Sequence, residues 1–102
     1  MTISKAGKYI RINDQIMGMN KEIFDTLNTF MSMTKANFED DIYIRLEPST
    51  VVEEDIMEML TQLKMAKKEE SPVGNEVFIP TPLFALYGQN LCDLAESMLK
   101  AA

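Results

Sequence analysis

Apolar residues recur at helical spacing in the stretch that follows Asn20. Asparagine is favoured at the cap of a helix, so we expect a helix from residue 20 to about residue 33. The apolar positions on one face are Ile23, Phe24, Leu27, Phe30 and Met31. The opposite face is polar, as in a helix that packs against a core. Residues 34–41 are polar and are expected to form a loop.

A second helix is predicted to begin at Ser49 or Thr50. Thr50 and Glu53 have the spacing of a capping box, in which each side chain bonds to the backbone of the other residue. Two alternatives stay open for residues 49–69: a continuous helix, or a short helix, a break and a second helix. The apolar stripe consists of Val52, Ile56, Met59, Leu60 and Leu63.

Short runs rich in β-branched and aromatic residues predict strands at 8–12, 41–46 and 76–80. The run DIYIRL at 41–46 alternates in polarity and stops before Pro48, whose nitrogen cannot extend a strand ladder. The sequence SPVGN at 71–75 has turn chemistry. If residues 66–70 are extended, they form a hairpin with the last of these strands.

The final helix, over residues 81–101, is the most clearly marked. Thr81 stands at the N-cap and Pro82 at the first helical position, where its missing N–H is no loss. The apolar residues form two adjacent stripes and leave only a narrow polar strip. An ordinary surface helix buries one face, so this helix needs two partners: its own core and a second copy of the chain.

We therefore predict a two-fold homodimer built on this helix. The alternative is a helix enclosed in the core of a monomer. Gly88 is also a point where the helix could break, because glycine costs about 1 kcal/mol in a helix interior. The predicted interface residues are Leu83, Phe84, Tyr87, Gly88, Leu91, Cys92, Ala95, Met98 and Leu99.

Composition indicates an ordinary globular chain. Its 102 residues fit one domain, with 46% hydrophobic and 25% charged residues. No apolar run is long enough to span a membrane, and the first ten residues, MTISKAGKYI, lack the apolar segment of a secretory signal. A single cysteine allows no disulfide within the chain. We expect a cytoplasmic protein with no membrane partner.

The usual signatures of catalysis are missing from the sequence. There is no histidine, so Cys92 has no imidazole to activate it, and no metal-ligand spacing occurs. The four glycines are dispersed and form no phosphate loop. We expect no enzymatic activity, no cofactor and no metal ion.

The element order, strand, helix, strand, helix, hairpin and long helix, resembles a winged helix-turn-helix domain. The resemblance rests on IYIRL at 42–46, IMEMLTQLK at 56–64 and SPVGNEVFIPTPLF at 71–84. It is similar in this respect to small winged-helix proteins of plasmids and phages, including replication initiators and partition adaptors. The resemblance implies one α+β domain over residues 1–102, with three main helices. It also implies a small antiparallel sheet with a hairpin wing and a C-terminal dimerisation helix.

The resemblance further implies a dimer that binds double-stranded DNA in plasmid or phage replication, partition or transcription control. Lysines at the end of the second helix and the base of the wing would contact phosphates, two amides would reach the groove, and an N-terminal basic group would act as an arm. These residues are Gln62, Lys64, Lys67, Lys68, Asn75, Lys5, Lys8 and Arg11. Late lysines also suit the helix dipole, and that alternative stays open.

The charge of the chain conflicts with DNA binding. The net charge is −6, and between residues 39 and 58 only Arg45 opposes the acids. Those acids are Glu39, Asp40, Asp41, Glu47, Glu53, Glu54, Asp55 and Glu58. Binding to phosphate gains affinity when Lys and Arg replace counterions, so an acidic surface opposes it. The second hypothesis is therefore a non-enzymatic interaction module, an adaptor or inhibitor that docks a basic protein or mimics DNA.

Overall fold

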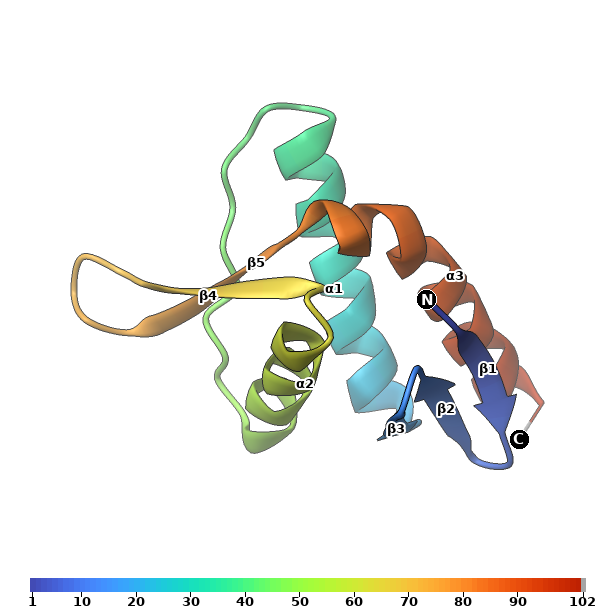
Figure 1. Ribbon diagram of the computed structural model, residues 1–102. Coiled ribbons are helices and arrows are strands. Elements are labelled where there is room, and N and C mark those ends of the chain that lie inside the picture. The colour runs from blue at the N-terminus through green and yellow to red at the C-terminus, as the bar shows by residue number, and fades with distance from the viewer. Residues whose placement is uncertain (102) are drawn as a thin grey trace.

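Three helices and two small antiparallel sheets make up the fold, which is of the α+β class (Figure 1). The computed structural model describes residues 1–101. In chain order the elements are β1 (Ile3–Ala6), β2 (Tyr9–Ile12), β3 (Gln15–Gly18), α1 (Lys21–Phe38), α2 (Val51–Gln62), β4 (Ala66–Glu70), β5 (Glu76–Pro80) and α3 (Pro82–Lys100).

The first sheet is a meander in the order β1-β2-β3. The strand predicted at 8–12 is confirmed as β2 (Tyr9–Ile12), and the turn after it contains Asn13 with a φ of 55°. Ile10, Ile12 and Met17 are buried on the inner face of the sheet. The strands β1 and β3 were not predicted, because four residues give too little alternation to separate a strand from a loop.

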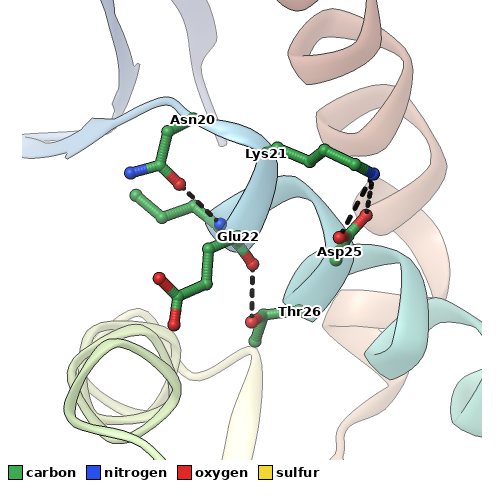
Figure 2. Close-up of polar contacts among 6 residues, drawn as sticks. Asn20, Lys21, Glu22, Asp25 and Thr26 are labelled. Atoms are coloured by element: carbon green, nitrogen blue, oxygen red, sulfur yellow. Dashed lines mark hydrogen bonds and ion pairs between the residues drawn. The ribbon is translucent and has the colours of Figure 1, made fainter.

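Helix α1 begins at the predicted cap. The side chain of Asn20 accepts a hydrogen bond from the Ile23 amide at 2.9 Å, and Figure 2 shows this cap beside the Thr26 hydroxyl, which donates to the Glu22 carbonyl. The predicted end near residue 33 is wrong, since the helix continues to Phe38. Thr34 is buried, and its hydroxyl donates to the Phe30 carbonyl at 2.7 Å, so this polar residue packs inside the helix interface instead of ending it.

The strand predicted at 41–46 is also wrong. Residues 42–45 belong to no strand, and only Leu46 pairs, through an isolated antiparallel bridge to Phe78 of β5. A run with strand-like alternation forms a strand only where a neighbour supplies the ladder of hydrogen bonds. Here the chain between α1 and α2 passes β5 with one bridge (Figure 1).

Helix α2 is a single uninterrupted helix, and only half of the predicted capping box forms at its start: the Glu53 carboxylate accepts from the Ser49 amide at 3.1 Å and not from the Thr50 amide. The Thr50 hydroxyl accepts from the Glu53 amide at 3.1 Å. The helix ends at Gln62, and Lys64, with a φ of 65°, turns the chain into β4. Residues 49–69 therefore form neither one long helix nor two helices with a turn. The predicted hairpin is confirmed: β4 and β5 pair from Ala66 with Pro80 to Glu70 with Glu76.

Helix α3 starts after Thr81 as predicted and runs unbroken through Gly88. The Thr81 hydroxyl does not cap the helix but donates to the Lys64 carbonyl at 2.7 Å. The helix packs along α1, where the rings of Phe84 and Phe30 meet edge to face with centroids 4.9 Å apart. Five residues assigned to the dimer interface are thereby enclosed within one chain: Phe84, Gly88, Leu91, Cys92 and Ala95.

Candidate functional site

One lysine of the hairpin is paired with acidic side chains of its own chain. Lys68 on β4 lies 2.6 Å from a carboxylate oxygen of Glu58 and 3.7 Å from one of Glu76. Its ammonium group also stands 5.7 Å from the centroid of the Phe78 ring. The hydrogen bond to Glu58 is the main reason that the pKa of Lys68 is raised above 10.5. A lysine held by two carboxylates offers little free charge to a phosphate.

The other DNA-contact candidates near the hairpin do not converge on one surface. Lys67 and Lys68 are adjacent on β4, so they point to opposite faces of the hairpin. Lys64 lies in the turn after α2. Asn75 lies in the exposed hairpin turn, where its backbone N–H donates to the Ser71 hydroxyl. At the end of α2, Gln62 accepts a hydrogen bond from Gln15 of β3 at 3.4 Å.

The N-terminal basic residues occupy a different part of the molecule. Lys5 and Lys8 line a hollow of about 350 Å³ between the first sheet and the end of α3. Arg11 is exposed on β2. The hairpin and the first sheet lie on opposite sides of the molecule in Figure 1. The two basic groups therefore do not form one continuous strip.

Acidic side chains dominate the surface beside the hairpin. Glu54 and Asp55 are exposed on α2, the helix that precedes the hairpin. A hollow of about 320 Å³ opens between this helix and the hairpin turn. Its lining includes Glu47, Glu54 and Glu76. This arrangement attracts positive groups and repels phosphate.

The segment from residue 43 to residue 47, which we call the edge segment, lies along this acidic surface. On one side, Leu46 exchanges both backbone hydrogen bonds with Phe78, each at 2.8 Å. Two residues earlier, the side-chain amide of Asn37 does the same for Ile44: it accepts from the Ile44 N–H at 2.7 Å and donates to the Ile44 carbonyl at 3.1 Å. The edge segment is thus held at alternate residues.

The other residues of the edge segment, Tyr43, Arg45 and Glu47, leave their backbone N–H groups without a protein acceptor among residues 1–101. The Arg45 guanidinium stands 5.1 Å from the centroid of the Tyr43 ring, as residues two apart on one face of an extended chain do. The Tyr43 hydroxyl donates to Glu69 of β4, and this bond raises the pKa of Tyr43 above 10.0.

Apolar side chains are exposed at the same place. Ile42 is 53% exposed, Tyr43 61% and Ile44 37%, and Phe38 at the end of α1 is 49% exposed. No sequence motif marks these residues, or Asn37, as functional. Their strand-like pattern was visible in the sequence, but the missing strand partner is a property of the tertiary structure.

The other four residues of the predicted interface are not enclosed in the core. Leu83, Tyr87, Met98 and Leu99 are half-buried on α3 and so remain partly accessible to a second chain.

Cys92 is buried, and this burial raises the pKa of its thiol to about 11. Among residues 1–101, no three acidic or cysteine side chains gather in a way that would hold a metal ion.

In the described part of the chain, no helix combines the length and apolar character needed to cross a membrane. Comparison with known proteins adds no assignment. A scan against family models, a search of curated proteins and a search of solved structures each found no match for this chain.

Proposed function

We propose that this chain is a protein-interaction module that uses its acidic surface to bind a basic partner protein. The proposed scaffold is winged-helix-like, because a helix, a hairpin and a long C-terminal helix follow one another as the sequence resemblance implies. It departs from a helix-turn-helix unit in having one helix, α2, before the hairpin.

The charge of the helix before the hairpin carries this proposal. In a DNA-binding domain of this type that helix enters the major groove, whose phosphate borders favour Lys and Arg. The exposed positions of α2 include Glu54 and Asp55, and its half-buried Glu58 pairs with Lys68 of the hairpin. Complementary charge steers association with a basic protein, so the same surface suits a positively charged partner.

DNA binding in plasmid or phage replication, partition or transcription control remains the second candidate. The observation that favours it is a helix followed directly by a hairpin, with Lys64 and Lys67 exposed at their junction. The proposed homodimer is common to both candidates. Its interface would use the accessible residues of α3 rather than the five enclosed in the core.

A paired binding assay distinguishes the two functions. The purified protein is tested over a salt series against immobilised extract of its host and against two duplexes: random-sequence DNA and the DNA upstream of its own gene. We expect a defined protein partner whose retention falls with salt and is weakened by the double variant Glu54→Lys, Asp55→Lys. The variant Lys64→Ala, Lys67→Ala, Lys68→Ala should leave that partner bound.

The opposite result assigns the second function. A salt-dependent shift of duplex DNA that the triple lysine variant weakens, together with no salt-sensitive protein partner, would replace the interaction module with DNA binding.

A further inference from the structure

We infer that the edge segment accepts an extended, basic segment of a partner protein as an added β-strand. The inference rests on the proposed function and deepens it, since it names the docking site and the form of the partner. Addition of a strand to an open edge uses backbone hydrogen bonds for affinity and alternate side chains for specificity.

One side of the edge segment presents an open row of backbone groups. Leu46 and Ile44 direct their N–H and carbonyl groups to Phe78 and Asn37, respectively. In an extended chain successive residues direct these groups to opposite sides, so Tyr43, Arg45 and Glu47 direct theirs away. Their three N–H groups have no partner within residues 1–101. This is the spacing that an incoming strand requires.

Exposed apolar side chains flank this row of backbone groups. Ile42, Tyr43 and Ile44 are consecutive and all exposed, and Phe38 at the end of α1 is exposed as well. A sequence that alternates like a strand but has no sheet to cover it leaves apolar area in water, and contiguous exposed apolar side chains mark an interaction surface. An added strand with alternating apolar residues would cover it.

The negative charge around the edge segment indicates the chemistry of the partner strand. Between residues 39 and 47 the acids Glu39, Asp40, Asp41 and Glu47 oppose Arg45 alone, a net charge of −3 from four negative and one positive residue. Next to Glu47 lies the hollow of about 320 Å³ with its two further glutamates, which suits a Lys or Arg side chain. The complementary strand is therefore basic.

A second copy of this chain is a poor occupant of the same edge. Two copies paired along this edge would bring Glu39, Asp40, Asp41 and Glu47 of both chains to one contact. Repulsion between like charges destabilises such a contact. Each copy would also bring its net charge of −3 to the contact.

The test uses a library of random twelve-residue peptides selected on the full chain. We expect the enriched peptides to be basic with alternating apolar residues. Their affinity is then compared for the variants Arg45→Pro and Arg45→Ala, which lose the same charge. Only proline also removes the unpaired N–H, and its ring blocks the ladder. The expected result is binding at least about tenfold weaker to Arg45→Pro than to Arg45→Ala.

A second pair of variants tests the charge. The triple variant Glu39→Gln, Asp40→Asn, Asp41→Asn should weaken binding at low salt and flatten its salt dependence. A control with the same change in charge, Asp14→Asn, Glu22→Gln, Asp93→Asn, should leave both nearly unchanged. Amide spectra of each free variant establish that the fold is retained.

Each other outcome overturns the edge site. Selection of no peptide, selection of acidic peptides, or equal affinity for Arg45→Pro and Arg45→Ala would each do so. Peptides that bind both Arg45 variants equally but fail on Glu54→Lys, Asp55→Lys would leave the interaction module standing with another docking site. A wild-type dimer that Arg45→Pro dissociates would make the second copy the occupant instead.

Discussion

The ammonium group of Lys68 lies 2.6 Å from a carboxylate oxygen of Glu58, which joins the hairpin to the exposed edge of α2. In the sequence these two residues look like opposite charges on one helix, the acid early and the lysine late. In the structure the lysine is on a strand, and Glu76 approaches it from the neighbouring strand at 3.7 Å. A residue expected to bind phosphate therefore pairs with two carboxylates of its own chain.

Replacing Glu58 by Gln should lower the pKa of Lys68 towards 10.5, because the carboxylate that raises it is gone. The raised pKa means that the pair stabilises the fold fully below 10.5 and that this contribution is lost as pH rises through the higher folded-state value. NMR titration of the Lys68 side chain measures the shift. Glu54→Gln, on the same helix, is the control, and an unchanged pKa in Glu58→Gln would contradict the ion pair.

Replacing Asn37 by Ala should free the chain between α1 and α2. The substitution removes both hydrogen bonds that hold Ile44, each of which contributes about 1 kcal/mol. Hydrogen exchange at the Ile44 amide should accelerate by about tenfold or more. Asn28→Ala changes the same residue type on the exposed side of the same helix and should leave that exchange rate unchanged. Equal rates in the two variants would remove Asn37 from its holding role.

The Glu53 carboxylate at the start of α2 should make stability depend on pH in the acidic range. Glu53 accepts hydrogen bonds from the amide and hydroxyl of Ser49, and the hydroxyl bond is the largest of the causes that lower the pKa of its carboxyl below 4.5. Its contribution is present above pH 4.5 and is lost as pH falls through the lower folded-state pKa. The difference in urea stability between the wild type and Glu53→Gln should therefore shrink below about pH 4.5.

Two further variants check this assignment. Thr50→Ala removes the hydroxyl that accepts from the Glu53 amide and should lower the free energy of unfolding by about 1 kcal/mol at neutral pH. Glu54→Gln, one residue along on the exposed side, should show no matching pH dependence. A stability difference for Glu53→Gln that stays constant down to strongly acidic pH would show that the carboxylate does not act as a cap.

Replacing Gly88 by Ala should destabilise the chain although alanine is the better helix former. A methyl group at this position would lie 2.7 Å from a ring carbon of Phe84 and 3.0 Å from the sulfur of Met31. Overpacking of a core costs about 1–3 kcal/mol, against a gain of about 1 kcal/mol in helix propensity. We expect a net loss of about 1 kcal/mol in chemical denaturation. A stability equal to or above that of the wild type would mean that α1 and α3 pack less closely than described.

Elements stabilised by local interactions could be predicted from the amino-acid sequence alone. Asn20, Thr50 and Pro82 mark helix starts through hydrogen bonds or backbone geometry within a few residues, and the turn SPVGN defines the hairpin. The end of α1 was misplaced because Thr34 looked like loop chemistry but is covered by the core. Local patterns report what a residue prefers, and burial overrides that preference.

The groups that the surfaces present depend on contacts between distant parts of the chain. The run at 41–46 has the pattern of a strand, yet whether it pairs depends on a neighbour more than thirty positions away, and it receives one bridge from Phe78. The two apolar stripes of α3 were consistent with a dimer or an enclosed helix, and the packing of α1 and both sheets encloses five of the nine residues. Lys68 became a partner of Glu58 because the hairpin folds back beside α2. Such contacts join distant positions, so no spacing along the chain announces them.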